Sequence, residues 1–190
     1  MRCLSCEKWS FSHLCQRCQK EFIVPNPEIR VLDNGLKVLS FFPYDEIDFL
    51  LKTKHTDLGY YIYTLLAKKT LLAFKEAFKY DHHLSIIPID DRAPFGYAHT
   101  AIMAKSMKSK QLHPTYHALQ SQNSISYSGK PLSFRQANSR DFKLLKPPKH
   151  DVLLIDDIVT TGETLTQAVN LLDSKNIETI MAVVLADANR

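Results

Sequence analysis

Two adjacent carboxylates, several threonines and a glycine follow an apolar tetrapeptide near the C-terminal end of the sequence. The stretch from residue 151 to residue 165 reads DVLLIDDIVTTGETL. Threonine hydroxyls and the backbone N–H groups of a loop that opens a helix can donate hydrogen bonds to a phosphate, and Gly162 removes a side chain that would block close approach. Asp156 and Asp157 would suit sugar hydroxyls or a magnesium ion. The pattern therefore predicts a site for a sugar phosphate.

Other interpretations of this stretch are weaker. The acids and threonines could simply cap the following helix, although one of them would be enough for capping. The five glycines lie too far apart for G-x-G-x-x-G or for the P-loop pattern, so a P-loop nucleotide site is excluded.

All four cysteines lie in the first 18 residues, as two C-x-x-C pairs. Cys3 and Cys6 form the first pair, and Cys15 and Cys18 form the second. Two such turns facing each other provide the tetrahedral sulfur set that zinc prefers in structural sites. Four free thiols and a redox pair are the alternatives, and His13 could replace one cysteine. We expect a structural zinc ion that stabilises a segment too short for a core of its own.

Two further features of the sequence could be mistaken for sites. His82 and His83 are adjacent and have no obvious third ligand, so we expect the C-terminal turn of a helix there rather than a metal site. Trp9 is expected to form the small apolar core of the cysteine segment, with a base-stacking platform as the alternative.

The middle of the chain is strongly basic. Residues 92–150 contain ten Lys or Arg and a single acid, whereas the whole chain has a net charge of +4. This asymmetry indicates a polyanionic ligand, either phosphates or a nucleic-acid backbone. Residues 109–140 show no clear period and predict a long loop, in which Tyr116, Tyr127 and Phe134 could stack on single-stranded bases. A solvated basic loop without a ligand is the alternative.

The elements that must position these residues alternate between strands and helices. Apolar runs predict strands at residues 37–44, 84–89, 152–155 and 179–186. Helical spacing predicts helices at residues 45–54, 57–80, 97–108 and 163–174. Strands that are apolar on both faces and alternate with helices indicate the α/β class, with a mainly parallel sheet covered on both sides. Ligands of such sheets bind at the carboxyl ends of the strands, where Asp156 and Asp157 are expected.

Two domains are expected, and no membrane span. Prolines in residues 24–30 mark an extended connection, so the boundary is placed after a zinc module of residues 1–24, and residues 25–190 form the second domain. No apolar run approaches the length of a transmembrane helix, and the first ten residues lack the pattern of a secretory signal. We therefore expect a cytoplasmic protein.

The stretch VLLIDDIVTTGETL resembles the ribose-5-phosphate loop of the type I phosphoribosyltransferases, which bind phosphoribosyl pyrophosphate (PRPP). The resemblance implies a type I phosphoribosyltransferase-like sheet. It implies that the two acids hold the ribose 2- and 3-hydroxyls, that residues 160–164 hold the 5-phosphate, and that Mg²⁺ arrives with PRPP. The PRPP-binding residues implied are Asp156, Asp157, Ile158, Val159, Thr160, Thr161, Gly162, Glu163 and Thr164.

The rest of the chain is similar to the ComF family of competence proteins, often labelled predicted amidophosphoribosyltransferases. The similarity rests on the two C-x-x-C pairs, on YDEIDFLLKTK, on IIPIDDR and on an R-x-x-N pattern. Where the family usually has R-G-F-N-Q, this chain has FGYAH at residues 95–99, which keeps only the glycine. We expect contacts to pyrophosphate, another anion or DNA from Arg92, Lys130, Arg135 and Asn138.

The ComF resemblance implies a role in DNA uptake during natural transformation. It implies binding of PRPP with magnesium and of single-stranded DNA, at the inner face of the inner membrane, with DNA-translocation or recombination proteins as partners. The alternatives are an active phosphoribosyltransferase of nucleotide metabolism and a non-catalytic PRPP-sensing scaffold. The FGYAH departure puts catalysis, more than PRPP binding, in question.

Overall fold

The computed structural model describes residues 1–89, 92–93, 96–121 and 141–190. The helices are α1 (Gln16–Phe22), α2 (Tyr44–Leu51), the 3₁₀ helix η1 (Lys52–His55), α3 (Asp57–Ala77), α4 (His99–Ser106) and α6 (Glu163–Asp173). The strands are β1 (Glu28–Val31), β2 (Lys37–Pro43), β3 (Leu84–Pro88), β4 (Leu112–Pro114), β5 (Leu119–Ser121), β6 (Phe142–Leu144), β7 (Val152–Val159) and β8 (Thr179–Asp187).

Six of these strands form one mainly parallel sheet with the order β1-β2-β8-β7-β3-β4. Only the edge strand β1 is antiparallel to its neighbour. The central strands β7 and β8 are largely buried and consist of Val, Leu, Ile, Met and Ala, apart from Asp156 and Asp157 within β7 and the terminal residues Thr179 and Asp187 of β8. Such strands need cover on both faces, and the α/β class predicted from the sequence is confirmed.

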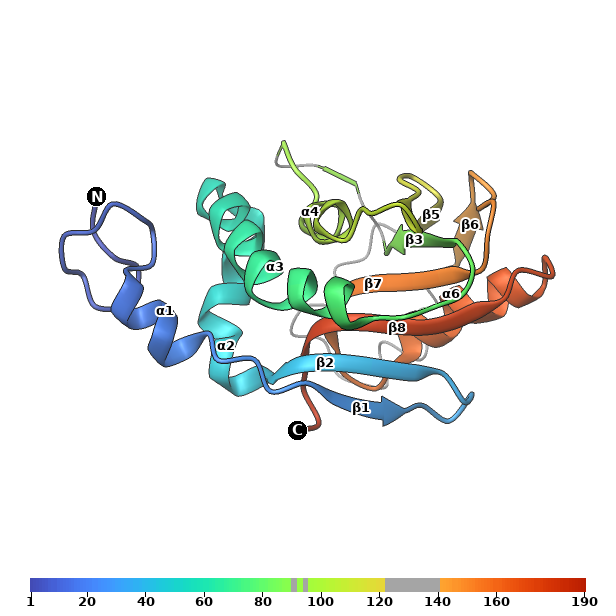
Figure 1. Cartoon of the computed structure of the whole chain (residues 1–190), viewed down its shortest axis with the longest axis horizontal. Coiled ribbons are helices and arrows are strands. Elements are labelled where there is room, and N and C mark those ends of the chain that lie inside the picture. Colours follow the sequence, from blue (N-terminus) through green and yellow to red (C-terminus); the bar gives the residue numbers. More distant parts are fainter. Residues whose placement is uncertain (90–91, 94–95, 122–140) are drawn as a thin grey trace.

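Two apolar layers cover the sheet (Figure 1). Helices α3 and α4 pack on one face through buried residues that include Ile62, Leu66 and Met103. Helix α6 packs on the other face through Leu165, Ala168, Val169 and Leu172, which recur at helical spacing. The antiparallel pair β5 and β6 joins that second layer through Leu119 and Phe142.

The predicted elements are present, with several differences. The strand predicted at residues 152–155 continues through Asp156 and Asp157 to Val159, because Asp156, Ile158 and Val159 remain paired with β8. Strands β1 and β4 to β6 were not predicted, and β4 and β5 lie within residues 109–140, which were predicted as loop. Residues 122–140 of that segment lie outside the described residues.

The N-terminal cysteine segment packs at one end of the molecule, beside α2 and α3 (Figure 1). Cys3, Leu14 and Cys18 are buried in the same apolar cluster as the core of α3. The ring of Phe22 on α1 contacts that of Phe49 on α2, with centroids 5.5 Å apart. Among the described residues, no helix combines the length and apolar character needed to cross a membrane.

Candidate functional site

A three-residue loop, residues 160–162, joins the end of β7 to the start of α6. Gly162 caps the helix in the left-handed region, with φ of 85°. A Cβ atom placed there would lie 2.5 Å from Cδ1 of Leu32. Both the backbone conformation and the close packing therefore favour glycine at this position.

The loop presents backbone donors at the N-terminus of α6. In the part of the chain that the structure describes, the N–H groups of Thr161 and Gly162 donate to no protein acceptor. The next N–H, that of Glu163, makes a long hydrogen bond of 3.4 Å to Oγ1 of Thr161. The first N–H groups of a helix lack intrahelical partners and carry the positive end of the helix dipole. This arrangement suits an anion such as a phosphate.

The outer side of the loop is held by β1 and by the C-terminal residues. The carbonyl oxygen of Thr160 accepts hydrogen bonds from Nη2 of Arg30 at 2.8 Å and from Nδ2 of Asn189 at 3.1 Å. Nε of Arg30 lies 2.9 Å from Oδ2 of the buried Asp187, as an ion pair rather than an aligned hydrogen bond. Arg30, Asp187 and Asn189 were not predicted as site residues, because no local motif links β1 and the C-terminal residues to this loop.

The two adjacent acids lie on opposite faces of the sheet. Successive side chains of a strand alternate between faces, and both acids belong to β7. Asp157 is 5% exposed and points to the α3–α4 layer. Asp156 is partly exposed, and its Oδ1 accepts a hydrogen bond from the N–H of Asp157. The two carboxylates therefore have different surroundings, which the sequence pattern did not indicate.

Three side chains surround the carboxylate of Asp157. Its Oδ2 lies 3.0 Å from Nζ of Lys54, 3.0 Å from the hydroxyl of Tyr63 and 3.5 Å from Nε2 of His99. Lys54 comes from η1, Tyr63 from α3 and His99 from the first turn of α4. A buried carboxylate needs such partners, because burial without them is very costly.

These contacts shift the pKa values of the acid and of the phenol in opposite directions. Burial alone would raise the pKa of Asp157, but the charges of Lys54 and His99 and the hydrogen bonds from Lys54 and Tyr63 hold it well below its usual range. Burial and the neighbouring carboxylate raise the pKa of Tyr63. Asp157 is therefore an ionised, internally paired acid.

Tyr97 and Gly59 hold the turn that carries Lys54. The hydroxyl of Tyr97 lies 2.7 Å from the carbonyl oxygen of Lys54 and 2.9 Å from that of Thr56. A Cβ atom on Gly59 would lie 2.3 Å from the backbone oxygen of Thr53, so only glycine allows this approach. Tyr97 and His99, which sequence analysis noted only as departures from R-G-F-N-Q, thus act on the surroundings of Asp157.

The other predicted anion contacts do not join this network among the described residues. Arg92 is exposed in the segment after β3. Lys130, Arg135 and Asn138 lie outside the described residues, as do Tyr127 and Phe134. The assignment of these side chains to pyrophosphate, another anion or DNA stays a prediction.

The four N-terminal cysteines converge on one point. Their sulfur atoms all lie within 4.8 Å of one another, and those of Cys6 and Cys15 are 3.7 Å apart. Tetrahedral zinc with sulfur ligands at about 2.3 Å requires sulfur–sulfur separations of about 3.8 Å. The cluster could therefore bind zinc.

The pKa values of two of these thiols are shifted in opposite directions. Burial raises the pKa of the Cys18 thiol to about 12. For Cys3 burial acts in the same direction, but hydrogen bonds from the backbone of Cys15, Cys6 and Ser5 outweigh it and lower the pKa to about 6. Cys18 would ionise at neutral pH only beside a positive charge, which a metal ion provides.

Two expectations about the N-terminal half of the chain are wrong. Trp9 is 82% exposed and forms no core of the cysteine segment, whose buried residues are Cys3, Leu14 and Cys18. His82 and His83 do not end a helix, because α3 stops at Ala77 and both histidines lie in the connection to β3.

Several solved structures are similar to this chain at low sequence identity. Hypoxanthine phosphoribosyltransferase from Staphylococcus aureus is 18% identical with a TM-score of 0.40, over 66% of this chain and 62% of that enzyme. Orotate phosphoribosyltransferase from Aeropyrum pernix is 18% identical with a TM-score of 0.42, over 90% and 80%. An adenine phosphoribosyltransferase is 14% identical with a TM-score of 0.45, over 89% and 88%. These likenesses are too distant to assign an activity.

Sequence comparison gives one match to a family. No curated protein sequence matches the chain. The family described as the phosphoribosyl transferase domain matches residues 100–190. The matched stretch begins in α4 and contains β7, both acids, the glycine loop and α6.

Proposed function

We propose that the carboxyl end of β7 binds PRPP together with magnesium. The observation that carries the proposal is that the N–H groups of Thr161 and Gly162, at the N-terminus of α6, have no acceptor among the residues that the structure describes. The family match over residues 100–190 supports the same ligand class. The 5-phosphate would lie against residues 160–164, with the threonine hydroxyls as additional donors.

The two acids have different roles in the proposed site. Asp156, on the face away from Lys54, accepts hydrogen bonds from the ribose hydroxyls. Asp157 keeps its contacts with Lys54 and Tyr63 and positions β7 for binding. Magnesium bound to PRPP would supply charge neutralisation for the pyrophosphate. A ribose contact from Asp157 would first require Lys54 to move.

Ribose 5-phosphate tests this assignment directly, because it carries only the groups that residues 156–164 would contact. It should raise the thermal unfolding midpoint of the wild-type protein more than that of Asp156→Asn, which keeps only the phosphate contacts. Inorganic phosphate should act equally on both proteins, since it has no ribose. Equal stabilisation of both proteins by ribose 5-phosphate would contradict the role of Asp156.

An assay for pyrophosphate release distinguishes an active enzyme from a protein that only binds PRPP. An active phosphoribosyltransferase would release pyrophosphate from PRPP and magnesium with one of a panel of amines and nucleobases. The internal pairing of Asp157 and the FGYAH departure favour a protein that binds PRPP without turnover. Steady release with any acceptor would establish the enzyme instead.

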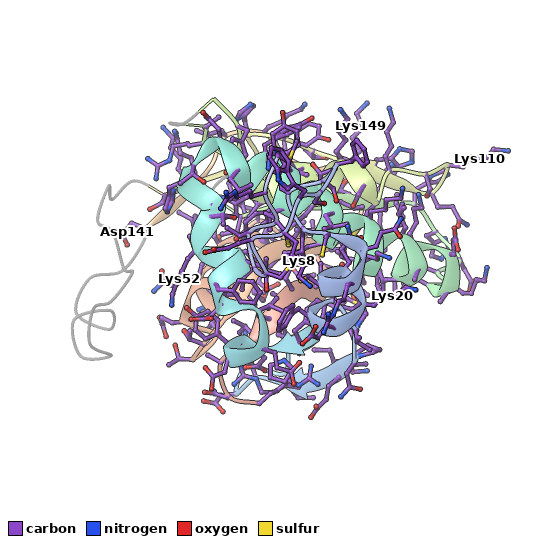
Figure 2. All side chains as sticks on the ribbon, turned by 90° about the vertical axis from the view of Figure 1, so that its left-hand side faces the viewer. Lys8, Lys20, Lys52, Lys110, Asp141 and Lys149 are labelled. Carbon is purple, nitrogen blue, oxygen red and sulfur yellow. The ribbon has the colours of Figure 1, made fainter. Side chains whose placement is uncertain are left out.

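Single-stranded DNA is the second proposed ligand, in a ComF-type role in DNA uptake at the inner face of the inner membrane. Trp9 and Phe11 are 82% and 107% exposed on the cysteine module, and single-stranded DNA binding uses such aromatic side chains for stacking. Lys8 and Lys20 lie on the same module, which faces the viewer in Figure 2. DNA-translocation or recombination proteins would be its partners there.

Fluorescence anisotropy with a labelled oligonucleotide tests this second ligand. Binding should weaken as salt rises, because phosphate contacts release counterions. The double variant Trp9→Ala, Phe11→Ala should bind at least about tenfold more weakly, because stacking contributes about 1–3 kcal/mol per base. Ile29→Ala, an exposed apolar residue on β1, is the matched control. Equal binding by all three proteins would exclude the module as the DNA surface.

A further inference from the structure

Three histidines far apart in the sequence meet at the edge of the sheet opposite the proposed PRPP site. The centroids of the His83 and His113 rings are 5.0 Å apart, and the His150 ring lies 5.3 Å and 5.6 Å from them. Nδ1 of His83 and Nε2 of His113 are only 2.8 Å apart. We refer to these three residues as the histidine cluster.

The register of the sheet accounts for the cluster. His113 on β4 pairs with Ser85 on β3, and Ser85 also pairs with Val152 on β7. His83 lies two residues before Ser85, and His150 lies two residues before Val152. His83 and His150 lie just before the first residues of β3 and β7, so the three rings come together near the amino ends of three neighbouring parallel strands. The backbone N–H of His150 donates to Oγ of Ser85 at 3.3 Å, which fixes this connection.

From this geometry we propose that the histidine cluster binds a divalent transition-metal ion of the zinc class. Imidazole nitrogen is a preferred ligand of zinc and of its neighbours in the first transition row. Two nitrogens about 2.1 Å from one ion lie about 3.0–3.4 Å apart at tetrahedral or octahedral angles. The His83–His113 pair needs to open by only a few tenths of an ångström to reach that separation.

His150 is the third ligand, after rotation of its exposed side chain toward the pair. Water would complete the coordination, because the pair lies at the surface. Three strands would then be tied at their amino ends, while the proposed PRPP site lies at the carboxyl ends of the sheet. The proposal does not depend on the proposed function.

Two further polar groups and one more histidine lie close to the histidine cluster. Tyr80 and Asp151 lie near the same edge, where the Tyr80 hydroxyl is 3.4 Å from Oδ2 of Asp151. His82 points elsewhere, with its ring against that of Tyr80.

Calorimetric titration with Zn²⁺ tests the proposal on the full untagged chain, after its cysteine cluster has been loaded with zinc and the excess removed. The wild-type protein should bind about one further ion per chain. His83→Gln and His113→Gln should each weaken this second binding by at least about tenfold, as loss of a ligand does at other metal sites. His150→Gln should have a smaller effect, because its ring starts farther from the pair.

His82→Gln is the matched control, since it removes an adjacent exposed histidine outside the cluster. It should bind the second ion within about twofold of the wild type. Elemental analysis should find the first zinc unchanged in every variant, which shows that the cysteine cluster is intact. Uptake of no second ion by the wild-type protein, or equal loss in His82→Gln and His83→Gln, would overturn the proposal.

Discussion

Asp157 shows how neighbouring residues of one type can take different roles. It and Asp156 look equivalent in the sequence, but one is buried against Lys54 and Tyr63 and the other is partly exposed on the opposite face. A buried carboxylate that has lost its water must be paired. Its primary contribution is therefore to fix η1, α3 and β7 relative to one another.

Removal of this charge should destabilise the fold. Asp157→Asn leaves the ammonium group of Lys54 without its counter-charge and should lower the free energy of unfolding by about 2–3 kcal/mol, somewhat less than for a fully buried pair because Lys54 is one quarter exposed. Asp156→Asn is the matched control and should cost less than about 1 kcal/mol, because an amide oxygen can still accept the Asp157 N–H. Urea unfolding of both variants measures this, and equal losses would contradict the division of roles.

The same carboxylate predicts an acid-dependent stability. Its pKa is lowered in the folded protein, so the stabilisation is present above the unfolded pKa of about 3.9 and is lost as pH falls through the lower folded value. The difference in free energy of unfolding between wild type and Asp157→Asn should therefore shrink as the pH falls below about 4, where the carboxylate takes up a proton. Urea unfolding from about pH 5 to about pH 3 measures it, and a difference that grows over this range would be inconsistent with the pairing.

Residue-level contacts were the least predictable part of the site. The acids, the threonines and Gly162 could be recognised because their types and spacing are local. Lys54, Tyr63 and Tyr97 could not, because each acts across more than 40 residues of sequence through the tertiary fold. Tyr97 and His99 were visible only as departures from a family motif, with no sign of what they contact.

At the scale of elements, the β7–α6 connection is the part that sequence predicts best. An apolar strand, a glycine and an amphipathic helix follow each other within 22 residues, and each signal is local. The end of β7 was placed too early, because Asp156 and Asp157 are poor strand formers that pairing with β8 nevertheless holds in the strand. The short strands β4 to β6 were missed for the same reason, since three-residue strands depend on their partners.

Substitution of the loop glycine should affect both stability and ligand binding. Gly162→Ala forces a Cβ into the left-handed region and against Leu32, so the free energy of unfolding should fall by about 1–2 kcal/mol. Gly35→Ala is the matched control for backbone strain, because Gly35 has φ of 84° and an open environment. Only Gly162→Ala should also weaken the stabilisation by ribose 5-phosphate, and equal weakening by both would mean that the loop is not the binding element.

For the whole molecule, the cysteine module and the α/β domain share one core. The sequence predicted a boundary near residue 24, and that boundary stays a prediction. Cys3 and Cys18 are nonetheless buried in the same cluster as Ile62 and Leu66 of α3. The packing of the module could not be predicted. An 18-residue segment with few apolar residues has no hydrophobic pattern that would indicate which surface of the α/β domain it contacts.

Loss of the metal from the cysteine cluster should therefore destabilise the whole protein and not only the module. Treatment with a strong chelator should remove one tightly bound zinc per chain and lower the thermal midpoint by about 5 °C or more. Cys3→Ser should reproduce both effects, whereas Ser10→Ala, whose hydroxyl lies 3.4 Å from that of Ser12, should retain the zinc. A metal-free preparation that unfolds at the wild-type temperature would show that the cluster has no structural role.

The central claim is that this fold binds PRPP through the loop after β7. Calorimetric titration of the zinc-loaded protein with PRPP, with and without Mg²⁺, tests it most directly. We predict one site per chain, tighter binding with Mg²⁺, and at least about tenfold weaker binding in Asp156→Asn, because the ribose would lose a charged acceptor. No binding by the wild-type protein, or equal binding by wild type and Asp156→Asn, would contradict the account.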